Sequence, residues 1–224
     1  MNQLAISQTK RCQVYIPRFN EETRLDVMHA LIESQPFAAL VTTGSTGLIA
    51  SHIPMVLNRT EGPHGTLRCH LSRANKQGRD LTPSVEALAI FSGAHHYISP
   101  SWYPEKAEDG KVVPTWNYAV VHAYGPIPLV EDPTQLLAHL NALTTQHESG
   151  FATPWQVSDA PADYIASQMK GIIGIEIPIT RIEGKWKVSQ NKSESTLRAV
   201  EQGLEDLNTP EALAMRDLVR GKRP

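Results

Sequence analysis

One stretch of the chain strongly favours a β-strand. Within residues 171–182, isoleucine recurs at Ile172, Ile173, Ile175, Ile177 and Ile179. β-Branched side chains are enriched in strands, because they pack well on a pleated surface. The run therefore predicts a strand, and it makes a β-sheet the framework on which the rest of the chain is arranged.

Shorter runs bounded by turn residues predict further strands. They cover residues 37–43, 48–57, 66–72, 85–92, 118–124 and 127–130. Apolar residues at three- and four-residue spacing predict helices between and after them. These are a helix capped by Asn20 and stopped by Pro36, then 133–147, 162–169, 193–207 and a last helix from Thr209. Strands joined mostly in sequence order favour a mainly β, antiparallel barrel with helical additions, an α+β fold, over a βαβ sheet.

Composition bounds the class of protein. The chain has 224 residues, 41% of them apolar and 20% charged, which indicates a globular fold with a substantial core. A net charge of −2 gives no bulk electrostatic case for nucleic acid. No apolar run is long enough for a membrane span, and the polar start of the chain does not resemble a secretion signal. Cys12 and Cys69 lack CxxC spacing, so we expect two free thiols in a reducing cytoplasm.

Large aromatic rings lie beside short polar side chains in a few segments. These are residues 95–103, 114–118 and 184–192, which hold three of the four tryptophans. Such a mixture suits a flat heteroaromatic ligand that carries a phosphate. In the last segment Lys187, Ser189 and Asn191 alternate, so in an extended chain they share one face. Gln190 lies on the other face, and we favour a ligand or subunit contact here over an exposed hairpin end.

The chain contains neither GxGxxG nor GxxxxGK[ST], so side chains must hold any bound phosphate. Residues 70–76 are the best candidate, because a strand ends there and a helix starts near Asn75, whose free amides favour an anion. Ser72 offers a hydroxyl, Arg73 a planar pair of donors and Lys76 a point charge. A turn that is merely solvated explains the same residues, and both interpretations stay open.

Other chemistries have less support. No HxxxH, HExxH or Cys/His spacing occurs, and His95 and His96 would point to opposite faces of a strand, so we expect no metal site. An axial haem ligand stays open, because one exposed histidine suffices for it. The chain has no GxSxG motif and no paired carboxylates, so hydrolase and glycosidase functions are unsupported and no catalytic residue is assigned.

A series of separated motifs runs through nearly the whole chain. They cover residues 15–17, 51–54, 70, 74–75, 96–103, 113–118, 122–125, 170–174 and 187–192. In this order they resemble the PaiB family of FMN-binding proteins. The resemblance implies a split β-barrel related to the pyridoxamine-phosphate-oxidase-like flavoproteins, with FMN between the subunits of a homodimer. It also implies that residues 1–207 form the FMN-binding domain with peripheral helices, and that 208–224 are a C-terminal helical extension.

The resemblance also implies roles for individual residues. The strand at the edge of the isoalloxazine ring would supply Ser51, His52, Ile53 and Pro54. The phosphate would be held by Ser72, Arg73, Asn75 and Lys76, with His70 just before them. A last group of residues would either come from the partner subunit or close the pocket from the same subunit. This group is Trp116, Asn117, Lys187, Gln190 and Asn191.

The function that the resemblance implies is negative transcriptional regulation, associated with protease and sporulation genes. The sequence shows no helix-turn-helix pair, so DNA is a partner by family analogy only. The alternative is a flavin-dependent oxidoreductase, such as a flavin reductase or a pyridoxamine-phosphate-oxidase-like enzyme, because a flavin supplies the hard chemical step itself. A haem-binding barrel is a third interpretation, and it rests on His52, His70, His96 and His122.

Overall fold

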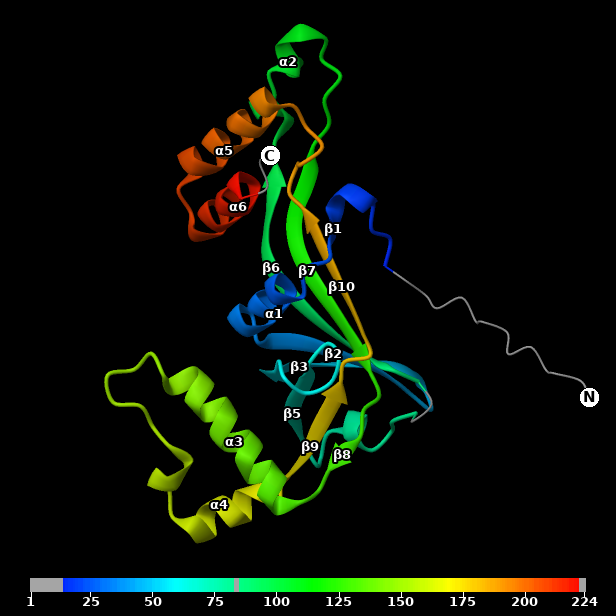
Figure 1. Cartoon of the computed structure of the whole chain (residues 1–224), viewed down its shortest axis with the longest axis vertical. Coiled ribbons are helices and arrows are strands. Elements are labelled where there is room, and N and C mark those ends of the chain that lie inside the picture. Colours follow the sequence, from blue (N-terminus) through cyan, green and yellow to red (C-terminus); the bar gives the residue numbers. More distant parts are fainter. Residues whose placement is uncertain (1–13, 83–84, 222–224) are drawn as a thin grey trace, which may run out of the picture.

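The computed structural model describes residues 14–82 and 85–221, and its strands form two antiparallel sheets (Figure 1). The larger sheet has the order β1-β10-β7-β6-β2-β3. Its strands are β1 (Glu21–Glu22), β2 (Phe37–Gly44), β3 (Gly47–Pro54), β6 (Ala87–Ile98), β7 (Thr115–Gly125) and β10 (Arg181–Lys187). The smaller sheet has the order β4-β5-β9-β8. Its strands are β4 (Val56–Asn58), β5 (Thr66–Ser72), β8 (Leu129–Val130) and β9 (Ile172–Pro178). This arrangement confirms the predicted antiparallel α+β fold.

Two predicted strands were wrong in the same way. Each is two strands that belong to different sheets: 48–57 divides at Met55, and 171–182 divides after Pro178. At both breaks the apolar pattern continues, because Met55 and Ile179 are buried in the core. The backbone nevertheless leaves its ladder there, and the amide of Ile179 donates to the carbonyl of Gly65 at 3.0 Å. Burial on both sides therefore hides the point where the chain crosses between sheets.

The predicted helices agree with the structure except at the first one, and one short helix, at residues 105–108, was not predicted. They are α1 (Leu25–Ser34), α2 (Glu105–Glu108), α3 (Pro133–Glu148), α4 (Ala162–Met169), α5 (Glu194–Leu207) and α6 (Pro210–Arg220). Asn20 does not cap α1: it is buried in a short 3-10 turn, and Glu21 and Glu22 pair with β10 as strand β1. Pairing with a neighbouring strand outweighs the local capping preference here. No helix in the described ranges is long and apolar enough to cross a bilayer.

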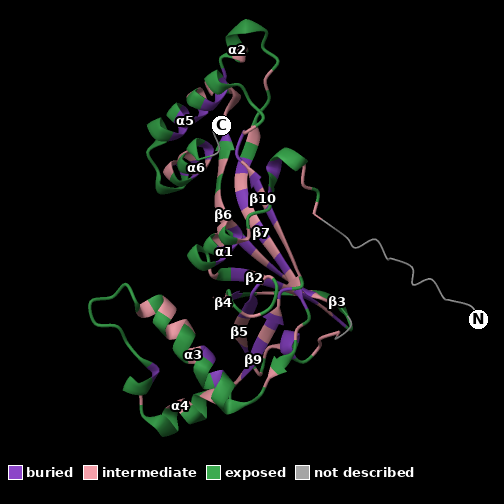
Figure 2. Ribbon diagram, in the orientation of Figure 1, coloured by how far each residue is buried: buried purple, intermediate pink, exposed green. Residues whose placement is uncertain are grey.

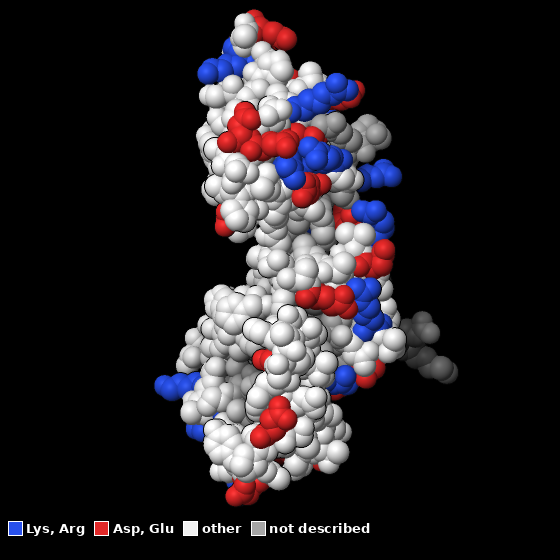
Figure 3. All heavy atoms as spheres, turned by 90° about the vertical axis from the view of Figure 1, so that its left-hand side faces the viewer, with Lys and Arg blue, Asp and Glu red and all other residues white. Residues whose placement is uncertain are grey.

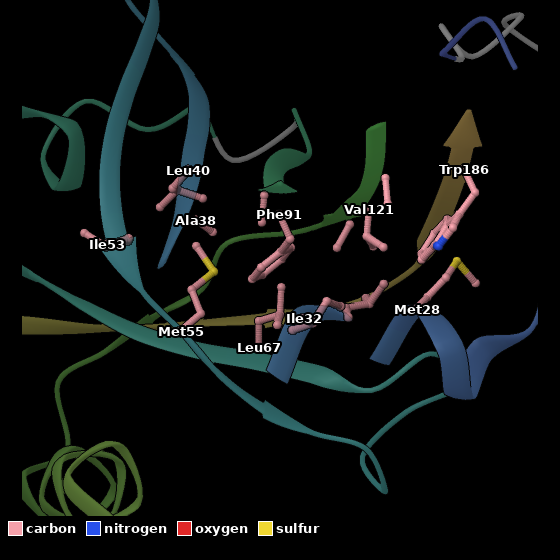
Figure 4. Close-up of a cluster of buried hydrophobic side chains, with 14 of the residues drawn as sticks. Met28, Ile32, Ala38, Leu40, Ile53, Met55, Leu67, Phe91, Val121 and Trp186 are labelled. Carbon is pink, nitrogen blue, oxygen red and sulfur yellow. The ribbon is translucent and has the colours of Figure 1, made fainter. Parts of the chain in front are cut away.

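The hydrophobic core lies between the two sheets (Figure 4). Leu40, Phe91 and Val121 enter it from the larger sheet, and Leu67 enters it from the smaller one. Figure 2 shows that buried residues follow the strands, whereas α3 and α4 are mostly exposed. Cys69 is also in this core, and burial raises the pKa of its thiol to about 12, so the thiol stays neutral. Cys12, the other predicted free thiol, lies outside the described residues.

Strands β6 and β7 continue past β2 as a long arm. The pairing of β2 with β6 covers only residues 88–90, whereas β7 pairs with β6 as far as Ile98. Helix α6 packs on β6 in this arm, and α5 packs on α6 (Figure 1). Ala212, Met215 and Val219 of α6 are buried in the common core. The described part of the predicted extension 208–224 therefore packs directly against the barrel.

The longer helices all lie on one side of the molecule. In Figure 1, α1, α3, α4, α5 and α6 are to the left of the strands. Along β7 the residues alternate, with Asn117, Ala119, Val121 and Ala123 buried and the residues between them partly exposed. The second set faces away from the core, and none of these helices covers it. Within the described ranges, no helix therefore covers the outer face of the larger sheet.

Candidate functional site

A tight turn after β5 brings two of the predicted binding segments together. Asn75 caps the short 3-10 helix Lys76–Gly78: its Oδ1 accepts from the amide of Gln77 at 2.9 Å. Its Nδ2 donates to Oγ of Ser51, on β3, at 3.1 Å. Within the turn, Oγ of Ser72 accepts from the amide of Ala74 at 3.2 Å. The predicted ring segment and the predicted phosphate segment are therefore neighbours in the folded chain.

A buried glutamine anchors this turn to the barrel. Gln77 is fully buried, and its Nε2 lies 3.0 Å from the carbonyl oxygen of Leu40 and 3.1 Å from Oγ1 of Thr42. Both acceptors belong to β2, so the turn is tied to the larger sheet from inside. Gln77 was not among the predicted site residues, because a single glutamine in a polar stretch gives no sign that it will be buried.

Two cationic side chains line a small hollow in the turn. The hollow has a volume of about 130 Å³ and is lined by Arg73, Asn75, Gly78, Arg79 and Ile173. It is several times the ~30 Å³ that one water molecule occupies in the liquid. Arg79 was missed, although it follows Lys76 by three residues, which places these two side chains on one side of the 3-10 turn. Guanidinium forks beside an amide are suited to a phosphate.

One carboxylate, that of Glu131, already pairs with Arg73 and would compete with a bound anion for it. Nη1 of Arg73 lies 3.3 Å from Oε1 of Glu131, and the two side chains are 41% and 70% exposed. An ion pair this exposed contributes little to stability. An anion that reaches Arg73 can therefore displace Glu131 at small cost.

His70 points away from the hollow and toward α3. Its Nδ1 lies 3.0 Å from Nε2 of His139, in the space between β5 and the helix. Burial lowers the pKa of both imidazoles, that of His139 to about 4, so the pair is neutral at pH 7. His70 does not line the hollow, and the structure gives it a packing partner that the sequence did not reveal.

The predicted ring segment is the edge strand β3. His52 is exposed there, with its ring centroid 6.1 Å from that of Phe37 on β2. Ile53 faces the core, so it can offer a ligand only its backbone groups. Ser51 and Pro54 are half-buried on the same strand. Since β3 has only β2 beside it, its second backbone edge is not paired in the larger sheet.

The remaining predicted residues lie at the far end of the arm. Trp116 is 53% exposed, and its ring centroid lies 6.2 Å from those of His95 and Tyr97. Asn117 is fully buried, and its Nδ2 donates to Oγ of Ser189 at 2.9 Å. Trp116 is thus available to a ligand, whereas the Asn117 side chain holds the fold of the neighbouring turn.

Lys187 and Gln190 are also used within the fold. Nζ of Lys187 donates to the carbonyl of Trp116 at 2.7 Å, and burial lowers the pKa of this ammonium. In the side chain of Gln190, Nε2 donates to the backbone carbonyl of Phe19 at 2.7 Å, and Oε1 accepts from the backbone amide of Val188 at 2.8 Å. These contacts brace the end of β10.

The predicted alternation along 187–191 was wrong. Ser189 has a φ of 64°, in the left-handed region, so the extended chain ends there. The amide of Lys192 donates to the carbonyl of Ser189 at 2.9 Å, which closes a turn. Lys187, Ser189 and Asn191 therefore do not share one face: Ser189 is buried and Asn191 is exposed.

Within one chain the two groups of predicted residues stay apart. Ser51 is in register with Leu40, Leu40 with Ala89, and Ala89 with Ala123. Trp116 is seven residues along β7 from Ala123 (123 − 116), which is about 23 Å at ~3.3 Å per residue. This separation exceeds the length of a flavin mononucleotide.

The described residues contain no cluster of side chains suited to a metal ion, and they do not gather the histidines that were considered for haem. Across the described ranges, no group of three or more His, Cys, Asp or Glu side chains could hold a metal ion. The histidines considered for haem lie on separate strands with separate neighbours. Nδ1 of His96 lies 2.6 Å from the carbonyl of Tyr97, and Nδ1 of His122 lies 3.5 Å from the hydroxyl of Tyr124.

Comparison with known proteins gives the family. Residues 14–181 match the model of a family described as "Putative FMN-binding domain". The chain belongs to this FMN-binding family. Membership supports a flavin cofactor and confirms the resemblance seen in the motifs. The matched range includes the turn, β3 and Trp116, whereas Lys187, Gln190 and Asn191 lie beyond it.

Relatives share most of their length with this member of the FMN-binding family. It is 34% identical to an uncharacterized protein of Emericella nidulans, over 92% of this chain and 96% of the relative. It is 30% identical to the protease synthase and sporulation protein PAI 2 of Bacillus subtilis, over 93% of this chain and 98% of the relative. These values show common family membership along nearly the whole chain.

Solved structures confirm the split-barrel fold of this FMN-binding family member. The FAD and heme binding protein of Mycobacterium smegmatis superposes with a TM-score of 0.56 at 14% identity, covering 75% of this chain and 73% of that one. The flavocytochrome Anf3 of Azotobacter vinelandii superposes with a TM-score of 0.52 at 12% identity, covering 77% and 72%. At such low identity the likeness shows the fold alone.

The residues present fit the phosphate of a flavin nucleotide. The hollow offers the guanidinium groups of Arg73 and Arg79 and the amide of Asn75, while Lys76 is exposed beside it. A phosphate dianion would neutralise part of this charge and would accept hydrogen bonds from these donors. At the end of the arm, by contrast, the side chains of Asn117, Lys187 and Gln190 already bind partners within the fold.

Proposed function

We propose that the protein is a homodimeric flavoprotein that binds one FMN per site between two copies. The phosphate lies at the turn of one copy, and the ring approaches Trp116 of the other copy. The observation that carries this proposal is the distance of about 23 Å between the two groups along β7. One chain cannot bring both to one ligand, whereas a second copy placed against the open sheet face supplies the missing half.

The open face of the larger sheet supports the dimer. Phe37, Leu48, Tyr97 and Trp116 all lie on this face and are 64%, 78%, 42% and 53% exposed. Large apolar side chains gathered on one exposed face mark a surface that another molecule covers. A second copy would bury them, and it would bring the two groups of binding residues within reach of one flavin.

Each group of residues has a defined task in this site. Arg73, Lys76 and Arg79 bind the phosphate, and Asn75 fixes the turn against Ser51. Trp116 packs against the flat ring from the partner side. The flavin, when bound, supplies the capacity to accept and donate electrons. The protein itself positions the nucleotide and excludes water from the ring.

A mixed dimer tests the proposal. One copy carries Arg73→Ala with Lys76→Ala, the other carries Trp116→Ala, and a different affinity tag on each allows the mixed dimer to be isolated. If the site combines two copies, one of its two sites is intact and the dimer binds one FMN with wild-type affinity. If each site lies within one copy, no intact site remains and tight binding disappears. Light scattering that shows only a monomer would also refute the proposal.

For the biological role, we propose that the flavoprotein acts in the cytoplasm as a regulator. Its 30% identity to protein PAI 2, whose name refers to protease synthesis and sporulation, favours this role. The alternative is a flavin-dependent oxidoreductase. Adding NADH or NADPH to the FMN-loaded dimer separates the two: rapid bleaching of the flavin spectrum favours the enzyme. An unreduced flavin together with a band shift on promoter DNA favours the regulator.

A further inference from the structure

A large groove lies beside the turn at residues 72–79, which is the proposed phosphate site and is called the phosphate turn below. It has a volume of about 1140 Å³ and runs between α3, the 3-10 turn Val157–Asp159, and α4. Its lining is mostly apolar, with Leu136, Leu137, Val157, Ile165 and Met169. Figure 3 shows that the surface over these elements, in the lower half of the view, carries few charged residues. The groove is large enough for a sizeable organic group, since ligand pockets commonly span ~300–1,000 Å³.

The groove meets the phosphate hollow at Arg73. This side chain lines both of them, and Lys170 lines the groove nearby. The groove also contains two carboxylates. Glu131 is the exposed partner of Arg73, and Asp159 accepts from the amide of Gln156 at 2.9 Å. The cations are therefore placed where the groove begins, next to the site of the FMN phosphate.

We propose that this groove receives the adenosine half of FAD. The inference rests on the proposed phosphate site at the turn, because the AMP part of FAD is attached to that phosphate. A second phosphate would lie between Arg73 and Lys170, and the flat adenine would pack on the apolar lining. Polar edges of the base would meet Asn141 and Ser158, which line the same groove. The chain then binds FAD more tightly than FMN.

The test compares the two flavins on the flavin-free protein by quenching of flavin fluorescence. Ala166 is exposed on α4 and lines the groove, so Ala166→Glu places an anion in the groove without removing any core contact. Ser167→Glu adds the same charge to the same helix at an exposed position that does not line the groove. We expect the wild type and Ser167→Glu to bind FAD about tenfold more tightly than FMN, or better. Ala166→Glu should lose this advantage and keep its FMN affinity.

The opposite results are distinct. Equal affinity of the wild type for FAD and FMN overturns the inference and leaves the FMN site standing, as does an unchanged FAD preference in Ala166→Glu. If Ala166→Glu instead converts the dimer to a monomer, the groove is an interface between copies and the inference is wrong. If the wild type binds neither flavin, the proposed function itself fails.

Discussion

Acid should destabilise this protein through one buried histidine. His139 is 6% exposed, in the space between α3 and β5, and its Nε2 lies 3.0 Å from Nδ1 of His70. Burial is the main cause that lowers its pKa to about 4, and the nearby charges of His70 and Arg68 act in the same direction. An imidazole in the unfolded chain has a pKa of about 6.5. At a pH between about 4 and about 6.5, the imidazole of His139 is therefore protonated in the unfolded chain and neutral in the folded chain.

The size of the effect follows from this difference. Stability is fully present above about pH 6.5 and falls as the pH is lowered, because protonation favours the unfolded chain. For pKa values of 6.5 and about 4, the loss between pH 7 and pH 5 is about 2 kcal/mol, and it approaches ~3 kcal/mol below pH 4. Burial also lowers the pKa of His70, which adds to the loss in the same direction.

Urea unfolding followed by tryptophan fluorescence measures this loss at pH 7 and pH 5. His139→Gln removes the titrating group and keeps a polar side chain beside His70. In this variant the fall in unfolding free energy should be about 2 kcal/mol smaller than in the wild type. His147→Gln, at an exposed position near the end of the same helix, is the matched control and should behave as the wild type. Equal pH dependence in all three proteins would refute the assignment of the effect to His139.

Two further predictions concern the site and the arm. Arg73→Ala with Lys76→Ala should weaken FMN by about a hundredfold and riboflavin by less than about twofold, because only phosphate contacts are lost. Isothermal titration with both ligands checks this, and equal weakening would contradict the phosphate assignment. Asn117→Ala should lower the free energy of unfolding by about 1–3 kcal/mol, because Asn117 is fully buried and its serine partner loses a hydrogen bond. Asn191 is exposed, so Asn191→Ala is the control and should change the free energy of unfolding by less than ~0.5 kcal/mol in the same urea series. A similar loss of stability in Asn117→Ala and Asn191→Ala would contradict the structural role of Asn117.

Local signals predicted the regular elements well. Ser193 and Thr209 cap α5 and α6 through their hydroxyls, which accept from amides three residues later at 3.2 Å. The short helix predicted at residues 162–169 has the same bounds as α4. The strand crossings at Met55 and Ile179 could not be found in this way, because the residues are apolar on both sides of each crossing. They depend on which sheet has room for the chain, and that is a property of the whole fold.

The candidate site was predictable in part for a similar reason. The candidate phosphate-binding turn at 72–76 could be proposed from a short window, because its donor groups belong to nearly consecutive residues. The contact between His70 and His139 joins residues that are 69 apart in sequence, and nothing local marks it. The arm was harder still, because Asn117 and Gln190 look like ligand contacts by residue type. Instead, the side chain of Asn117 binds Ser189, and the side chain of Gln190 binds the backbone carbonyl of Phe19.

The position of α3 and α4 in the barrel has a consequence for how such proteins diverge. Both helices lie between β8 and β9, and these strands are hydrogen-bonded neighbours, with Val130 opposite Gly174. The two ends of the helical excursion therefore start and finish side by side on an intact sheet. Lengthening or shortening a connection of this kind costs little free energy, because the closure entropy changes slowly with length. The excursion is a natural place for insertion and exchange, so relatives can remodel the groove while the barrel and the phosphate turn stay the same.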